Sequence, residues 1–141
     1  MIAVERAAYS VGGLLFLSGV IHLAILLISG GTWEGPVSLR KAATFGLSFG
    51  LTLINVTFVA SFVPLKDRTR TALLGVFAVA CVLETFLVSL QAWRGVPSHF
   101  NVETPFDAAV AQTLAVGGFT LVAIIVALTA ATFRAGTALP R

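Results

Sequence analysis

The residue with the strongest claim to chemistry is Glu84, a carboxylate inside a long apolar run over 71–93. Ten residues separate it from Arg94, which places it about 15 Å from that end of a helix at 1.5 Å per residue. An ionised carboxylate at such a depth costs at least roughly 2.5–3.5 kcal/mol unless it is neutralised. We therefore expect Glu84 to be protonated, solvated or paired with Lys41 or His22, and to couple binding to protons or cations.

Further polar residues follow Glu84 at helical spacing and continue into a loop. Gln91 lies seven residues after Glu84 on nearly the same line of a helix, and Arg94 lies on an adjacent line. The segment after Arg94 then supplies Ser98, His99, Asn101 and Asp107. Arg94 offers a planar fork for a carboxylate or phosphate, and Asp107 is an acceptor for Arg94 or for loop amides. The alternative is a loop that satisfies its own polar groups and plugs the bundle.

A second polar stripe is predicted on the apolar run over 40–63. At 100° per residue, its polar residues share a sector of about 120°. We expect this stripe to face the bundle interior or a wet cavity, since polar groups are costly against lipid. Its hydroxyls and amide also suit hydrogen bonds between helices. The stripe consists of Arg40, Lys41, Thr44, Ser48, Thr52 and Asn55.

The two histidines permit a different hypothesis, in which the protein holds haem, a metal ion or a quinone. His22 lies in an apolar run and His99 in a loop, with Glu84 as a further ligand. No metal-type pair of cysteines or histidines supports this, and Cys81 stands alone in an apolar run. We therefore predict no resident cofactor, and no motif for a catalytic nucleophile is present.

Four apolar runs must position these residues: 7–29, 40–63, 71–93 and 107–133. Each exceeds the roughly 20 residues that an α-helix needs to cross the hydrocarbon core. Of the 141 residues, 57% are hydrophobic and 11% charged, whereas soluble domains carry roughly 25% charged residues. The composition excludes a soluble globule, and it excludes a nucleic-acid binder despite the net charge of +3, because the basic residues are not clustered on one face. We predict a single all-α domain of four transmembrane helices in an antiparallel bundle.

The linkers and the charges predict the topology. Breakers such as Gly30, Gly31 and Pro36 end the first span, a tight polar turn covers 64–68, and Thr104 is expected to cap the last helix. Basic residues are concentrated at the ends that carry the termini, which the positive-inside rule places in the cytoplasm. These are Arg6, Lys66, Arg68, Arg70, Arg134 and Arg141. On the opposite side of a bacterial cytoplasmic membrane, we then expect convergence of His22, Trp33, Arg40, Lys41, Glu84, Gln91, Arg94, His99, Asn101 and Asp107.

Two segments together resemble a group of uncharacterised bacterial polytopic membrane proteins. One is the start of the second span, Lys41-Ala-Ala-Thr-Phe-Gly-Leu-Ser48; the other is the linker from Gln91 through Arg94-Gly-Val-Pro-Ser-His-Phe-Asn to Asp107. Ala42 stands where the pattern of that group has proline. The resemblance implies that the 94–107 linker and Lys41 belong to one site, and it brings no known activity.

These patterns favour a small membrane protein that binds or transports an anionic, lipid-like or ionic ligand in a polar pocket. Its partners would be the lipid bilayer and that ligand. With only four spans, the protein would need to form an oligomer to provide a path for the ligand across the membrane. The redox or enzyme module described above is the second hypothesis. The third is a structural subunit of a larger membrane complex that uses its polar stripes for assembly.

Overall fold

The computed structural model describes residues 1–137 and contains four helices. They are α1 (Ala3–Ser29), α2 (Leu39–Phe62), α3 (Asp67–Arg94) and α4 (Pro105–Thr137). Each is long and apolar enough to cross a membrane, and no strand occurs within 1–137. The predicted four-helix membrane bundle is therefore confirmed. Arg141, counted above among the basic residues, lies outside the described residues.

Local sequence explains where the helices begin and end. The Ser38 hydroxyl accepts the Arg40 backbone N–H at 3.1 Å and begins α2. The predicted cap of α4 is also confirmed, because the Thr104 hydroxyl accepts the Asp107 backbone N–H at 3.1 Å. Gly30 and Gly95 follow α1 and α3 with φ of 67° and 69°, a left-handed conformation that glycine adopts without steric cost. The polar turn is shorter than predicted, since α3 already begins at Asp67.

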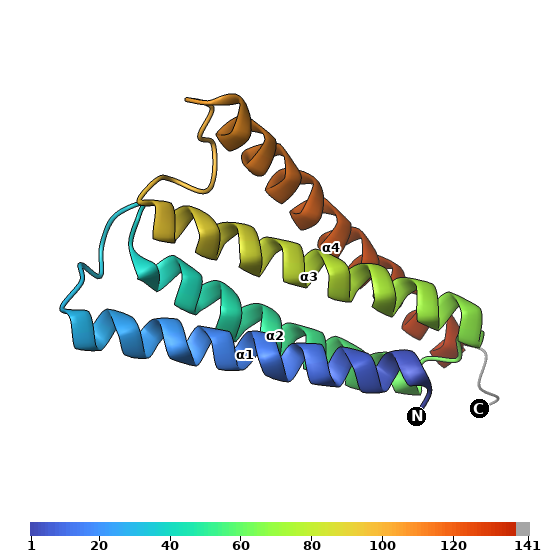
Figure 1. Ribbon diagram of the computed structural model, residues 1–141. Helices are drawn as coiled ribbons and strands as arrows, with labels where there is room; N and C mark the ends of the chain where they lie inside the picture. The colour runs from blue at the N-terminus through green and yellow to red at the C-terminus, as the bar shows by residue number, and fades with distance from the viewer. Residues whose placement is uncertain (138–141) are drawn as a thin grey trace.

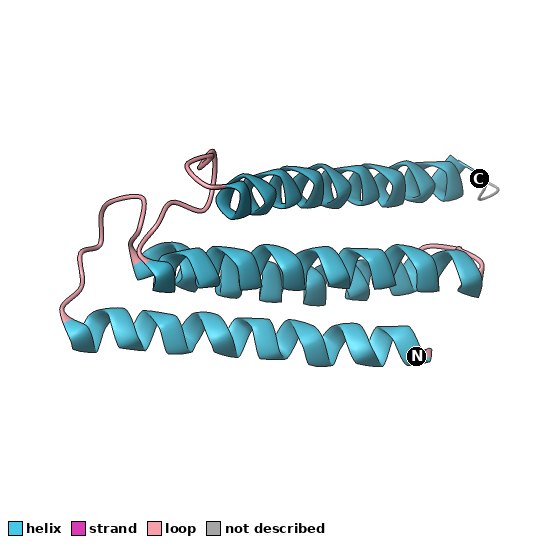
Figure 2. Ribbon diagram, turned by 45° about the horizontal axis from the view of Figure 1, so that its top comes forward, coloured by secondary structure: helices cyan, strands magenta, loops and turns pink. Residues whose placement is uncertain are grey.

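Successive helices run in opposite directions, so the loops gather at two ends. Figure 1 shows the α1–α2 and α3–α4 connections at one end, which we call the linker end. The N-terminus and the short α2–α3 turn lie at the other end. In Figure 2, α1 forms the lowest tier, α2 and α3 overlap in the middle, and α4 lies above them. The arrangement agrees with the predicted convergence of the candidate residues at one end.

Small residues let α1 and α2 approach closely. Gly12 and Gly19 of α1 lie on the α2 backbone, and a Cβ atom built on Gly19 would stand 2.8 Å from the Ala43 carbonyl oxygen. Gly46 and Gly50 are the matching positions on α2. Such contacts are typical of helix pairs in membranes, where dispersion and packing drive association.

The fourth helix packs less evenly. Figure 1 shows α4 near α3 at the end opposite the linkers and diverging from it toward the linker end. The apolar core lies where the helices converge and takes residues from all four of them. Its largest members include Leu53, Leu74, Phe77, Leu121 and Leu128. The divergence leaves grooves beside α4, and these contain the candidate site.

Candidate functional site

Glu84 is buried in the middle of α3, with 3% of its surface exposed. Its Oε1 atom has no hydrogen-bond partner among residues 1–137 and lies against Gly117 of α4. A Cβ atom at position 117 would collide with this oxygen, so the glycine makes room for the carboxyl group. Of the three predicted ways to neutralise Glu84, pairing does not occur with Lys41 or His22, since neither forms an ion pair with it within the described residues. The reason is geometric: His22 lies in another groove of the bundle.

A groove of about 430 Å³ opens beside Glu84, between α2, α3 and α4. We call it the Glu84 groove. Aromatic rings and aliphatic side chains form its walls, and only two lining residues are ionisable, Glu84 and His99. The lining residues are Phe45, Phe49, Glu84, His99, Leu114, Ala115, Gly118, Phe119 and Val122. The groove therefore combines a buried acid with an aromatic, apolar wall.

His99 reaches this groove from the α3–α4 linker. Its ring packs on Phe45 with centroids 5.7 Å apart, and the Ser98 hydroxyl lies 2.9 Å from Nδ1. Burial lowers the pKa of His99 below its ordinary value, and the positive charge of Lys41 lowers it further. At neutral pH His99 is thus an uncharged hydrogen-bonding group.

Lys41 lies at the start of α2, half-buried and close enough to His99 to act on its charge. Its ammonium forms no ion pair within residues 1–137 and does not line the Glu84 groove. The structure thus brings Lys41 and the linker histidine together at the linker end.

Asp107 is the centre of a separate buried network. Its Oδ1 accepts the Gln91 side-chain N–H at 2.8 Å and an Arg94 N–H at 2.6 Å, and its Oδ2 accepts the Thr104 hydroxyl at 2.6 Å. Arg94 also donates to the side-chain amide oxygen of Gln91 and lies 4.8 Å from the centre of the Phe106 ring. Opposite charges and polar groups satisfy one another here, so the predicted alternative of a self-satisfied linker describes this cluster. Gln91 and Asp107 are 0% and 2% exposed.

The rest of the linker is also bound to itself. Asn101 donates to the Pro97 carbonyl oxygen at 3.2 Å and accepts the Glu103 backbone N–H at 3.1 Å. This turn holds Phe100 at φ 58°, a conformation that costs a non-glycine residue energy. Asn101 is therefore a structural residue that sets the path of the linker beside His99.

Arg40 faces the other connection. Its Nε donates to the Trp33 carbonyl oxygen at 2.9 Å, and its guanidinium lies 5.9 Å from the centre of the Trp33 ring. Arg40 thus anchors the α1–α2 linker, while Arg94 anchors the α3–α4 linker. Arg40, Lys41 and Arg94 are the three cations predicted to meet an anionic ligand. Among them, the side chain of Lys41 alone has no hydrogen bond or ion pair that anchors a linker in the described part of the chain.

His22 is held between α1 and α3. Its Nδ1 lies 2.8 Å from the Ser18 carbonyl oxygen and must carry the hydrogen, and its Nε2 accepts the Trp93 indole N–H at 3.0 Å. Both ring nitrogens are used, so the ring is neutral and would have to break a bond to ligate a metal or haem. Within residues 1–137, no group of three or more His, Cys, Asp or Glu side chains is placed to hold a metal ion.

The predicted inward stripe of α2 is wrong for Thr44 and Ser48, which are exposed on the outside of the bundle. Asn55 is exposed as well, but it lines a groove of about 210 Å³ between α2 and α4. The interior face of α2 consists mostly of small residues, together with Leu53 and Thr57, because the glycines and alanines allow the close contact with α1. The Ser48 hydroxyl and the Asn55 amide donate to their own helix, to the Thr44 carbonyl at 2.6 Å and the Leu51 carbonyl at 2.8 Å.

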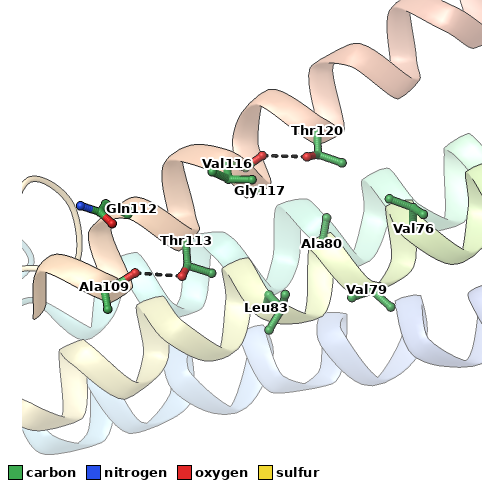
Figure 3. Close-up of a pocket in the computed structure, with 10 residues that line it drawn as sticks. All are labelled: Val76, Val79, Ala80, Leu83, Ala109, Gln112, Thr113, Val116, Gly117 and Thr120. Atoms are coloured by element: carbon green, nitrogen blue, oxygen red, sulfur yellow. Dashed lines mark hydrogen bonds between the residues drawn. The ribbon is translucent and has the colours of Figure 1, made fainter. Parts of the chain in front are cut away.

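A further groove of about 480 Å³ lies between α3 and α4, on the other side of Gly117 (Figure 3). Its walls are largely valine, alanine and leucine side chains. The hydroxyls of Thr113 and Thr120 are already bonded to the Ala109 and Val116 carbonyls, both at 2.8 Å. The Gln112 amide also lines this groove, but no ionisable side chain does, in contrast to the Glu84 groove.

One buried pair was not anticipated from the sequence. At the end opposite the linkers, Glu5 is 3% exposed and lies 3.5 Å from an Arg70 nitrogen, and Arg70 also donates to the Val63 carbonyl at 3.0 Å. The pair joins α1, α3 and the end of α2. The sequence does place acidic and basic residues at the same end of the bundle, which permits an ion pair there. It does not show which acidic residue pairs with which basic residue.

The chain matches no family model, no curated protein and no solved structure. Its function is therefore argued from the groove and the residues that surround it.

Proposed function

We propose that this protein binds a small apolar cation in the Glu84 groove and exchanges it for a proton on Glu84, as a membrane binding or transport protein. The observation that carries the proposal is the buried carboxyl group whose Oε1 has no partner within residues 1–137. A carboxylate at that depth must be neutralised, and a proton and a bound cation are the two simplest ways to do so.

The walls of the groove suit the same class of ligand. Phe45, Phe49 and Phe119 line the space beside Glu84, and aromatic faces attract cations while accepting apolar groups. His99, the other ionisable lining residue, is uncharged at neutral pH because of its lowered pKa. Nothing that lines the groove therefore opposes a positive charge near the carboxyl group.

The arginines support a cation rather than an anion. Arg94 is paired with buried Asp107, and Arg40 is bound to the α1–α2 linker. An anionic ligand would have to displace these contacts or bind to Lys41 alone. Lys41 lies near His99 and outside the lining of the groove, at the end that the charge pattern predicts to be non-cytoplasmic.

Equilibrium binding of tetraphenylphosphonium, a cation with four phenyl groups, tests the proposal. We expect the purified protein in detergent to bind it saturably and Glu84→Gln to lose at least tenfold in affinity, since the variant keeps the shape and removes the charge. The matched control is Glu103→Gln, which neutralises an exposed acid of the linker. Equal binding by all three proteins would refute the role of Glu84.

The exposed stripe of α2 favours a second candidate function, that of a subunit in a larger membrane assembly. The Asn55 side chain is exposed on a membrane-spanning helix, at the mouth of a groove between α2 and α4, and its amide satisfies one donor on its own helix. A second helix would supply the partners that lipid lacks. In a Cys81→Ala background, disulfide cross-linking of Asn55→Cys but not of Phe119→Cys in native membranes would support a symmetric assembly through α2; equal cross-linking would contradict it.

A further inference from the structure

Another groove, on a different face of α3 from Glu84, has the features of a binding site. It lies between α1 and α3 and has a volume of about 570 Å³. Polar residues from both helices line it at i,i+4 spacing, Ser18 and His22 on α1 and Thr85 and Ser89 on α3. We call it the Ser89 groove, and its remaining lining residues are Leu15, Val82, Phe86, Leu90 and Trp93.

Two hydroxyls in this groove have no partner in the described part of the chain. They belong to Thr85, which is 3% exposed, and to Ser89. Elsewhere in the helices, buried Thr57 and exposed Thr113 bond the carbonyl four residues before them, at 2.7 and 2.8 Å. A buried hydroxyl without a partner is costly, and both oxygens are covered from solvent. A change of χ1 rotamer would bring each hydroxyl from this buried position into the groove that its residue lines.

No acidic or basic side chain lines the Ser89 groove, and its histidine is neutral. The free polar groups are hydroxyls that can donate to an acceptor oxygen. Val82, Phe86 and Trp93 on its rim are 40%, 60% and 59% exposed, so the groove opens sideways toward the bilayer. Its occupant must therefore be neutral, soluble in lipid and equipped with an acceptor oxygen.

We propose that the Ser89 groove binds a neutral, lipid-soluble molecule through a carbonyl oxygen that accepts from Thr85 and Ser89. The apolar part of the molecule lies along Leu15, Phe86 and Leu90. Two sources share this chemistry: a membrane quinone and the acyl ester of a bilayer lipid. The site is separate from the Glu84 groove, because Thr85 and Glu84 are neighbours on different faces of α3.

The tryptophan fluorescence of the full chain in phosphatidylcholine vesicles tests the quinone. Trp33→Phe leaves Trp93, on the rim of the groove, as the reporter, and Trp93→Phe leaves Trp33, which lies in the α1–α2 linker. We expect a decyl-substituted benzoquinone to quench Trp93 saturably and Trp33 only in proportion to its concentration. Thr85→Val with Ser89→Ala should raise the half-saturating concentration roughly tenfold. Thr57→Val, whose hydroxyl is bonded to Leu53, is the matched control and should leave it unchanged.

Native mass spectrometry of the detergent-solubilised protein tests the lipid. A retained phospholipid that disappears in the Thr85→Val, Ser89→Ala protein and persists in Thr57→Val would identify the ester as the ligand. The double variant should unfold at the same temperature as the parent or higher, because it removes unsatisfied hydroxyls and keeps nearly the same shape. Non-saturable quenching together with no hydroxyl-dependent lipid would overturn the proposal.

Discussion

The Asp107 network predicts that Asp107→Ala destabilises the protein far more than the loss of another acid in the same linker. The carboxylate accepts three side-chain hydrogen bonds, from Gln91, Arg94 and Thr104, at 2.6–2.8 Å. It ties the end of α3 to the start of α4, where the two helices have diverged. Alanine would leave Arg94 and Gln91 without their acceptor.

The magnitude follows from burial. Breaking a buried ion pair by removing one partner costs about 3–5 kcal/mol. The Asp107 side chain is 3% exposed but that of Arg94 is 36% exposed, so water can partly solvate the remaining cation. We therefore expect a loss of unfolding free energy at the lower end of that range. For a chain of this size that corresponds to a fall in Tm of roughly 6–12 °C.

Thermal unfolding in one detergent measures this, with Glu103→Ala as the matched control. Glu103 is exposed and its side chain has no bond within residues 1–137, so its loss should change Tm by less than about 2 °C. An Arg94→Leu substitution should cost much less in the Asp107→Ala protein than alone. The reasoning would be refuted if Asp107→Ala and Glu103→Ala unfolded at the same temperature. If Asp107→Ala alone then failed to bind tetraphenylphosphonium, Asp107 would contribute to ligand binding and not to the stability of the linker.

Three further predictions follow from the packing and from His99. Gly19→Ala should unfold roughly 4–8 °C below Gly13→Ala by differential scanning fluorimetry, because a Cβ at 19 meets the α2 backbone and one at 13 meets nothing within 4 Å; equal Tm values would contradict the close α1–α2 contact. Gly117→Ala should weaken tetraphenylphosphonium binding by displacing the carboxyl of Glu84, whereas Gly75→Ala, which has open space and does not line the Glu84 groove, should not; equal binding would argue against the contact. Burial and the charge of Lys41 lower the pKa of His99 in the folded protein. The contribution of His99 to stability is therefore fully present above pH 6.5, which is its ordinary pKa, and is lost as the pH falls below that value. His99→Asn should flatten that part of the Tm–pH curve, and an unchanged curve would show that His99 is not the titrating group.

Sequence predicts the helices and their caps because these depend on local features. The position of α4 follows from an apolar run long enough to cross the bilayer and from the helix-start pattern Thr104–Pro105–Asp107. Gly95 marks the end of α3. The burial of Glu84 and Gln91 on one line of α3 also followed from helical spacing.

Which side chains meet across helices was not predictable in the same way. Periodicity shows that Ser48 and Asn55 share a face of α2, but the interior face is decided by the glycines that fit α1. Likewise, Arg94 had several acceptors within reach along the chain, and only the positions of the helix ends select Asp107. His22 was a candidate partner of Glu84 by depth, yet it faces Trp93 in a different groove.

Proton release on ligand binding tests most directly the claim that Glu84 exchanges a proton for a cation. Tetraphenylphosphonium is added to the protein in weakly buffered detergent near neutral pH, and released protons are counted with a pH indicator. The other titratable groups near the carboxyl are Cys81 on α3 and His99 in the linker, so Cys81→Ala and His99→Asn serve as controls. The account predicts about one proton released per cation bound by the parent and both controls, and none by Glu84→Gln. Cation binding without proton release, or equal release by Glu84→Gln, would contradict it.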